Sequence, residues 1–375
     1  MITQTSRYAD FPSLREQSYL NTAAEGIPPK AVVDALAQYG SDKMLGMDGR
    51  PLHEKQRLQA REQTAKAFGL NPEEIGICSC TSEAFNLASL ALALQDGDEV
   101  VISDLDFPAT ATPWLQPSCP AEVKVWRARD GALLLEDLEE MVGPQTRLVT
   151  VSLVSFFNGF RVSVPQVAEV VHARSDALLA IDVTQALGRI PLRLQGADLI
   201  VSSTHKWILS THGGGLVGVP NTRIVEWTVP AGGWFNLDDP FLREDRLERA
   251  DSLPGADSFS VGMPNYGAIY AANAALGYIQ SVGIESIDAY CKPLVEACLA
   301  GIAKLPVELL TPRQPDVLAG ILAFRHPDAE EINAALHDQN IHIMSHAGRL
   351  RVAIHGYNTM NDIDRLLGAL RTAVG

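Results

Sequence analysis

The stretch from Leu178 to Gly215 reads LLAIDVTQALGRIPLRLQGADLIVSSTHKWILSTHGGG and contains two short apolar runs that end in polar residues. The first run, Leu178–Asp182, ends on an acid, and the second, Leu199–Ser203, leads into Thr204-His205-Lys206. Continuous apolar runs of this length predict strands that are buried on both faces of a sheet. Ligands of such sheets lie at the carboxyl ends of the strands, so we expect the Asp182 carboxylate and the Lys206 amine to meet there.

An acid and an amine at one sheet edge match the needs of a pyridine cofactor. A carboxylate bonded to the ring nitrogen keeps the ring protonated, so the ring can accept electrons from the substrate. A lysine amine forms a Schiff base with such a cofactor and afterwards moves protons. Taken singly, Asp182 also fits a helix cap and Lys206 a solvated side chain. Their positions after two neighbouring predicted strands favour the catalytic interpretation.

Strand-like runs alternate with helical patterns on both sides of this stretch, from about residue 75 to residue 220. The other predicted strands are Ile75–Cys80, Glu99–Ser103, Lys124–Arg127, Arg147–Ser152 and Gly214–Val219, and the helices between them are Glu83–Leu94, Leu135–Met141 and Val164–Arg174. This alternation predicts an α/β fold whose mostly parallel, seven-stranded sheet is covered by helices on both faces.

A different pattern follows from about residue 263 onward. The long alanine-rich helix Tyr266–Val282 comes first, and the remaining chain alternates short strands with helices, which predicts a smaller α+β domain. We expect a large domain over residues 17–262 and a small C-terminal domain over residues 263–375, which also takes in residues 1–16.

Composition narrows the class of partners. The chain has 375 residues, of which 46% are hydrophobic, and its net charge is 30 − 45 = −15. This charge disfavours nucleic acids and anionic membranes as partners.

No apolar run is long enough for a membrane span and no secretory signal is visible, so we expect a cytoplasmic protein. The five cysteines fit reduced thiols, and Cys78-Ser79-Cys80 lacks the second ligand pair of a zinc site, so we expect no metal.

Several motifs together resemble one family, the class V aminotransferase branch of the fold-type I pyridoxal-phosphate enzymes. That branch includes cysteine desulfurases, kynureninases, aminotransferases and isopenicillin N epimerase-like proteins. The resemblance extends from YLNTAA at 19–24, through the Asp182 and Lys206 motifs, to RVAIHGYNT at 351–359. It implies pyridoxal 5'-phosphate as the cofactor, an amino acid as the substrate, and a homodimer with active sites at the interface.

The resemblance also assigns roles around the cofactor. It implies that Lys206 is the Schiff-base lysine, that Asp182 pairs with the pyridine nitrogen and that Gln185 donates to the ring hydroxylate. Thr81-Ser82-Glu83 resembles the family's phosphate loop, and Ser203 and His205 match the side chains that complete the phosphate site. Because Thr81-Ser82-Glu83 opens a predicted helix, free amides and the positive dipole end also favour a phosphate there, although plain helix capping is the alternative.

The same comparison implies contacts above the ring and with the substrate. Phe107 falls where the family stacks an aromatic ring on the cofactor, although a core position after the preceding strand is the alternative. Arg351 matches the arginine that holds the substrate α-carboxylate, for which its forked guanidinium is suited. Asn21 is expected to approach the substrate as well.

Two departures from the family pattern affect the expected reaction. Cysteine desulfurases carry a mobile cysteine shortly before the carboxylate-binding arginine, whereas the segment Ile341–Arg349 contains none. We therefore predict an aminotransferase and not a persulfide-forming cysteine desulfurase. A β-lyase for cysteine or cysteine sulfoxide and an amino-acid epimerase remain alternatives, and a non-catalytic scaffold is the least favoured. Met263 replaces a threonine that reaches the partner subunit's phosphate in many relatives, which leaves that contact open.

Overall fold

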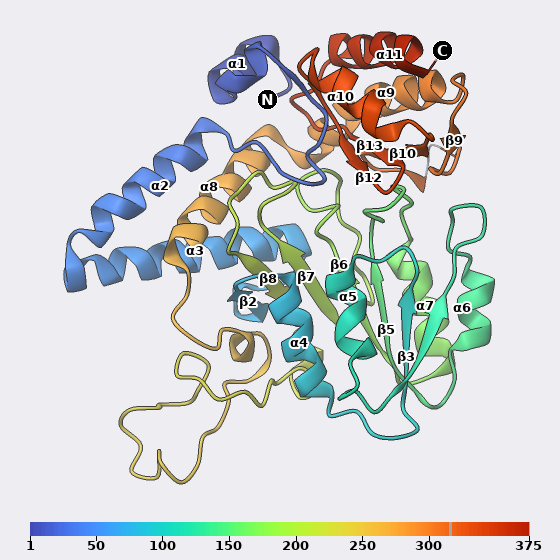
Figure 1. The fold of residues 1–375 in the computed structure, drawn as a ribbon. Coiled ribbons are helices and arrows are strands. Elements are labelled where there is room, and N and C mark those ends of the chain that lie inside the picture. The colour runs from blue at the N-terminus through green and yellow to red at the C-terminus, as the bar shows by residue number, and fades with distance from the viewer. Residues whose placement is uncertain (315–316, 375) are drawn as a thin grey trace.

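A seven-stranded sheet forms the centre of the structure, a computed structural model that describes residues 1–314 and 317–374. The strand order is β2-β8-β7-β6-β5-β3-β4 (Figure 1). The bounds are β2 (Ile75–Cys78), β3 (Glu99–Ser103), β4 (Glu122–Trp126), β5 (Thr146–Ser152), β6 (Leu178–Asp182), β7 (Leu199–Ser203) and β8 (Gly215–Gly218). β8 is antiparallel to both of its neighbours and the other pairs are parallel. The predicted mostly parallel sheet is confirmed, and no predicted strand end is wrong by more than two residues.

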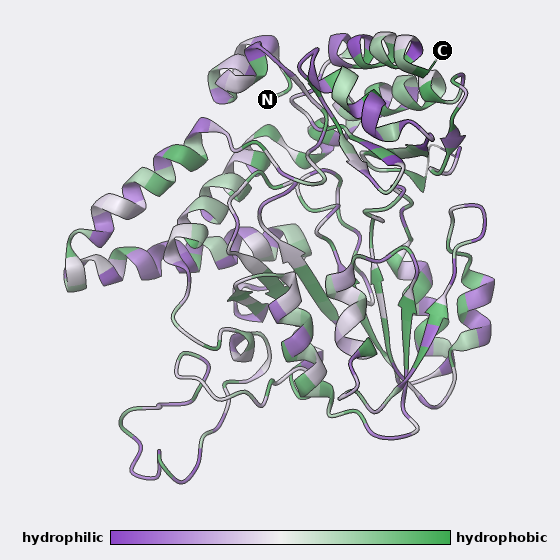
Figure 2. Ribbon diagram, viewed as in Figure 1, coloured by the Kyte–Doolittle hydropathy of each residue, from purple (hydrophilic) through white to green (hydrophobic). Residues whose placement is uncertain are grey.

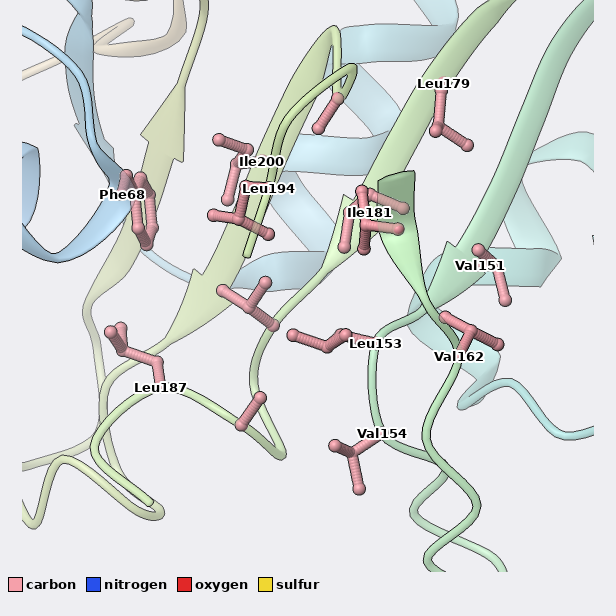
Figure 3. Packing of buried hydrophobic residues seen from close by; sticks show 14 of the residues in the cluster. Phe68, Val151, Leu153, Val154, Val162, Leu179, Ile181, Leu187, Leu194 and Ile200 are labelled. Atoms are coloured by element: carbon pink, nitrogen blue, oxygen red, sulfur yellow. The ribbon is translucent and has the colours of Figure 1, made fainter. Parts of the chain in front are cut away.

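Helices cover both faces of this sheet. One face packs against α3 (Arg50–Phe68), α6 (Leu135–Met141) and α7 (Val164–Arg174), and the other against α4 (Thr81–Leu92) and the short α5 (Pro108–Ala111). Figure 3 shows the first of these interfaces, in which the strand residues Val151, Leu179, Ile181 and Ile200 belong to one buried cluster. Burying each such side chain contributes about 1.5–3 kcal/mol. The strands accordingly appear as hydrophobic bands in Figure 2, because neither face of the sheet meets water.

A second, smaller sheet lies beyond the carboxyl ends of the large one (Figure 1). It is antiparallel, with the order β12 (Met344–His346), β13 (Arg349–Ala353), β10 (Ile321–Arg325) and β9 (Glu308–Leu309). α9 (Ile284–Ile302), α10 (Ala329–His337) and α11 (Met360–Val374) pack on it and share a separate hydrophobic core. The predicted smaller α+β region is therefore present.

The N-terminal part of the chain connects the two sheets. α1 (Gln4–Asp10) lies beside α11, where Arg7 pairs with Asp362 at 3.0 Å. β1 (Ser18–Tyr19) pairs in parallel with β11 (Ile341–His342), and α2 (Lys30–Lys43) packs with α3 against α8 (Tyr266–Val282). The predicted division of the chain near Gly262 remains a prediction.

Short 3-10 helices occupy several of the connections, at Pro12–Arg15, Gly46–Gly49, Pro72–Glu74, Thr112–Leu115, Asn221–Arg223 and Gly255–Phe259. Within the described ranges, no helix combines the length and the apolar character that a membrane crossing requires.

Candidate active site

Asp182 ends β6 at the edge of the large sheet that faces the four-stranded sheet. Its side chain is buried, and its two carboxylate oxygens accept hydrogen bonds from the Thr184 amide at 2.7 Å and from the Thr110 hydroxyl at 3.0 Å. Burial raises the pKa of Asp182, and the bonds from Thr184, together with the positive charge of Lys206, partly offset that increase. A cationic partner, such as a protonated pyridine nitrogen, would stabilise the ionised carboxylate here.

Lys206 follows β7, which pairs in parallel with β6, so both strands deliver their polar ends to one place. The Lys206 Nζ atom lies 5.0 Å from the centroid of the Phe107 ring. Burial lowers the pKa of this amine to about 8, although Asp182 and Glu25 oppose the change. A larger share of the amine is therefore neutral near neutral pH than for an exposed lysine, and the neutral amine is the nucleophile.

These two residues share a cavity of about 200 Å³. The cavity contains most of the predicted cofactor-binding residues, and its walls include Cys80, Thr81, Ser82, Phe107, Phe156, Asp182, Thr184, Gln185, Ser203, His205 and Lys206. Gln185 is fixed by two hydrogen bonds, because its amide oxygen accepts from Trp207 at 2.6 Å and its amide nitrogen donates to the Ala23 carbonyl at 3.1 Å. Phe107 is 41% exposed and forms the cavity wall, so the alternative of a core position does not hold.

Three hydroxyl groups cluster where α4 begins. The Thr81 hydroxyl oxygen lies 2.6 Å from that of Ser203 and 3.3 Å from that of Thr184. Hydroxyls and free amides at a helix start are suited to a phosphate. Thr184 and Thr110 were not among the predicted site residues. Thr184 lies two positions after Asp182, in the turn that follows β6, and this spacing was the available signal.

Glu83 is the predicted cofactor-binding residue whose side chain lies outside this cavity. Its carboxylate accepts from the Ser79 amide at 2.5 Å and faces a neighbouring cavity of about 130 Å³, which Met263 also lines. Its carboxylate, which is bonded to the backbone at the helix start, would repel a phosphate bound at the same end. The contact of Glu83 with the cofactor remains a prediction.

His205 lies at the rim of the cavity. Its ring stacks on that of His212 at 4.7 Å between centroids, and burial together with Lys206 lowers its pKa to about 4, so the imidazole is neutral. His212 is in turn hydrogen-bonded to Glu25 at 2.9 Å. In the described part of the chain, Glu25, His205 and His212 are a group whose spacing could hold a metal ion. The expected absence of a metal remains a prediction.

The predicted substrate residues Arg351 and Asn21 lie at β13 of the four-stranded sheet. Arg351 on β13 donates to the Phe156 carbonyl at 2.9 Å, and its buried Nε has no hydrogen-bond partner among the described residues. The buried Oδ1 of Asn21 also lacks a partner in the described ranges, and Asn21 forms a bridge with Ala353. Burial and the neighbouring Arg349 lower the pKa of Arg351 to about 10. Because buried polar atoms normally have hydrogen-bond partners, these two atoms are available to bind a polar ligand.

The donors and acceptors of the cavity fit pyridoxal phosphate. Asp182 matches the ring nitrogen, Lys206 the aldehyde carbon, and the hydroxyls of Thr81 and Ser203 at the start of α4 the phosphate. Phe107 supplies an aromatic wall. The fold and this site together define a pyridoxal-phosphate-dependent enzyme of fold type I.

Comparisons with known proteins identify the family. The family model "Aminotransferase class-V" matches residues 18–366, so the chain belongs to the class V aminotransferase family, whose cofactor is pyridoxal phosphate. "Uncharacterized aminotransferase YcbU" of Bacillus subtilis is 27% identical over 94% of this chain and 93% of that protein. A "Probable cysteine desulfurase" of Mycolicibacterium paratuberculosis is 30% identical over 97% of this chain, which spans 57% of that protein.

Solved structures confirm the fold. An apo cysteine desulfurase from Thermococcus onnurineus NA1 superposes with a TM-score of 0.90 at 23% identity, covering 100% of this chain and 98% of that one. At this identity the likeness supports the architecture alone.

The comparisons overturn the predicted reaction. We predicted an aminotransferase and excluded a persulfide-forming cysteine desulfurase, yet relatives that match along nearly the whole chain are named cysteine desulfurases. That prediction is wrong. It relied on one missing cysteine in the segment Ile341–Arg349, but a single loop position does not determine which bond of the substrate is broken.

The lowered pKa of Lys206 predicts how cofactor uptake depends on pH. When apoprotein is mixed with pyridoxal phosphate, the rate of covalent bond formation should increase as the pH rises through about 8, because only the neutral amine attacks. Stopped-flow absorbance at a series of pH values measures this rate. A midpoint near the usual lysine pKa of about 10.4 would contradict the buried environment described here.

Proposed function

We propose that the chain cleaves the carbon–sulfur bond of a cysteine-type L-amino acid, using pyridoxal phosphate held by Lys206. The observation that carries the proposal is the shared cavity of the Lys206 amine and the Asp182 carboxylate. The choice of bond is supported by relatives named cysteine desulfurase, among them a protein of Pyrococcus abyssi that is 24% identical over 97% of this chain and 96% of that protein.

The cofactor, when bound, supplies an electron sink for the pair that remains at Cα after a proton leaves. In the proposal, Lys206 removes that proton, because its lowered pKa keeps part of the amine neutral. Asp182 holds the ring nitrogen in its protonated form, and Thr110 and Thr184 fix the orientation of this carboxylate. Arg351 and Asn21 bind the α-carboxylate of the substrate.

The sulfur product depends on which atom keeps the electron pair of the broken Cβ–S bond. If sulfur leaves with both electrons of the Cβ–S bond, it departs as a thiolate, and water converts the remaining fragment to pyruvate and ammonium. If the carbon keeps both electrons of this bond, an acceptor thiol must take the sulfur atom as a persulfide, and the carbon fragment becomes alanine. We propose thiolate release because it requires no acceptor group. The second route is a further candidate, which the names of the relatives favour.

A pair of near-isosteric substrates tests the proposal. The holoenzyme should release methanethiol and pyruvate from S-methyl-L-cysteine in many turnovers and should release no product from L-norvaline, in which a methylene replaces the sulfur. Thiol reagents and a lactate dehydrogenase assay measure the two products, and amino-acid analysis of a parallel reaction with L-cysteine detects alanine. Equal conversion of L-norvaline to its keto acid, with no thiol from S-methyl-L-cysteine, would contradict carbon–sulfur cleavage.

We also propose that two copies of the chain form a homodimer with active sites at the interface. Support comes from the connection between α2 and α3, which projects away from the large sheet in Figure 1. Its side chains Met44, Leu45 and Met47 are 89%, 54% and 70% exposed. Contiguous exposed apolar side chains are typical of interaction surfaces. Light scattering of the eluting protein in size-exclusion chromatography measures the mass, and a mass of one chain would contradict the dimer. The cytoplasmic location remains a prediction.

A further inference from the structure

Two arginines on one face of β13 are buried without an acidic partner. Arg349 and Arg351 are 5% and 4% exposed, and residues two apart on a strand point to the same side. Across the described ranges, neither guanidinium forms an ion pair with a carboxylate. Burying a cation without a counter-ion is unfavourable, so this face of the strand is prepared to receive an anion.

Both guanidiniums keep hydrogen-bonding capacity for a ligand. Arg349 donates from Nη1 to the Phe157 carbonyl at 2.8 Å, and Arg351 donates from Nη1 to the Phe156 carbonyl at 2.9 Å. Each of these bonds uses one of the five N–H donors that an arginine carries. The Nε of Arg351 is buried and lacks a partner among the described residues.

Arg349 is connected to the cofactor cavity through aromatic rings. Phe156 lines that cavity, and its ring contacts Phe107 in a T-shaped arrangement at 5.1 Å between centroids. The guanidinium carbon of Arg349 lies 5.4 Å from the centroid of the Phe156 ring and 4.3 Å from that of the Phe157 ring. Arg349 therefore contacts an aromatic side chain that also lines the cavity of Lys206.

The residues paired with Arg349 across the sheet bring no acid against its guanidinium, although the whole chain carries a charge of −15. Arg325 on β10 is the strand partner of Arg349, and His346 is its partner on β12. The carboxylate beside them, Glu308, lies 3.6 Å from Arg325. An anionic group on a substrate would be attracted to the unpaired pair of guanidiniums.

We propose that Arg349 binds a second acidic group, located on the substrate side chain, while Arg351 holds the α-carboxylate. The inference rests on the proposed carbon–sulfur cleavage and names its substrate class: L-cysteine derivatives whose sulfur substituent ends in a carboxylate. Residues two apart on a strand are separated by roughly 6.6 Å. Five bonds separate the two carboxylate carbons of S-carboxymethyl-L-cysteine, which is enough for an extended ligand to reach both arginines.

The reaction of this substrate balances without an oxidant or reductant. The Cα proton is removed, the Cβ–S bond breaks, and its electron pair leaves with the sulfur as the thiolate of a mercaptocarboxylic acid. The remaining enamine takes up one water and gives pyruvate and ammonium. The released thiol carries the carboxylate that Arg349 bound.

A charged substrate and its amide isostere test the inference with the holoenzyme. The wild-type value of kcat/KM should be about tenfold or more higher for S-carboxymethyl-L-cysteine than for S-carbamoylmethyl-L-cysteine, because the acid alone forms a charge-assisted bond with Arg349. In Arg349→Gln this preference should fall to about one. Arg349→Lys should retain part of it, and Arg325→Gln, which removes an exposed cation on the neighbouring strand, should leave it within about threefold.

The possible outcomes separate this inference from the proposed function. An enzyme that cleaves S-methyl-L-cysteine but shows no preference for the acid over the amide retains the proposed function and overturns the inference. An Arg349→Gln variant that loses activity equally on both substrates, with Arg349→Lys behaving alike, assigns Arg349 to supporting the loop at Phe156 and also overturns it. Thiol from none of the three compounds contradicts the proposed function itself.

Discussion

Replacing Lys206 with alanine is expected to lower turnover by about a thousandfold or more and to leave the cofactor without a covalent bond to the protein. The amine lies in the same cavity as Asp182, its pKa is lowered to about 8, and its Nζ faces the Phe107 ring. Both the attachment of the cofactor and the movement of the Cα proton are proposed to depend on it. Borohydride reduction followed by peptide mapping measures the attachment, and steady-state kinetics measures the turnover.

A matched control is available for this variant. Lys30 is an exposed lysine at the start of α2 that pairs with Asp34 at 2.9 Å, so Lys30→Ala should change neither attachment nor turnover by more than about twofold. If the cofactor of the intact protein were trapped on another lysine, or if Lys206→Ala retained wild-type turnover, the assignment of Lys206 would be wrong.

The second large effect is expected for Asp182→Asn, which should lower turnover by about a hundredfold or more and weaken the retention of the cofactor. The asparagine keeps the size of the side chain and a partner for the Thr184 amide, but it loses the charge that would hold a proton on the ring nitrogen. The electron sink is weaker without that proton. Kinetics and equilibrium dialysis of the cofactor measure the two effects.

Asp198 provides a control of the same chemical type. It is a buried acid just before β7, where it accepts from the Leu179 amide at 2.8 Å and pairs with Arg223 at 2.7 Å, and it does not line the cofactor cavity. Asp198→Asn should lower thermal stability and leave kcat within about threefold. Equal losses of kcat in the two variants, at equal losses of stability, would show that Asp182 acts only as a structural acid.

The strands of the large sheet could be predicted because the local sequence alone shows which segments are buried on both faces. Strands buried on both faces must be apolar throughout, and Leu178–Asp182 and Leu199–Ser203 have the bounds that their apolar runs predict. The approach of Asp182 to Lys206 then follows from the parallel pairing of β6 and β7, which brings the ends of both strands to one edge of the sheet.

Other features depend on side-chain directions that a pattern of residues does not encode. Thr110 was not predicted, because its bond to Asp182 joins α5 to the end of β6 across 72 positions of sequence. Glu83 turns away from the cavity to bind the Ser79 amide, although its place at the start of α4 was correctly located. The reaction was predicted wrongly because the motifs bind the cofactor in every class of reaction considered, and no motif identified the bond that breaks.

The most direct test of the central claim follows the colour of the holoenzyme and the release of pyruvate together, after S-methyl-L-cysteine is added without a keto acid. Because carbon–sulfur cleavage leaves the cofactor unchanged after every cycle, the protein should stay yellow while pyruvate and methanethiol accumulate over many turnovers. A single loss of colour, accompanied by one keto acid per chain and no thiol, would show transamination and would contradict the account.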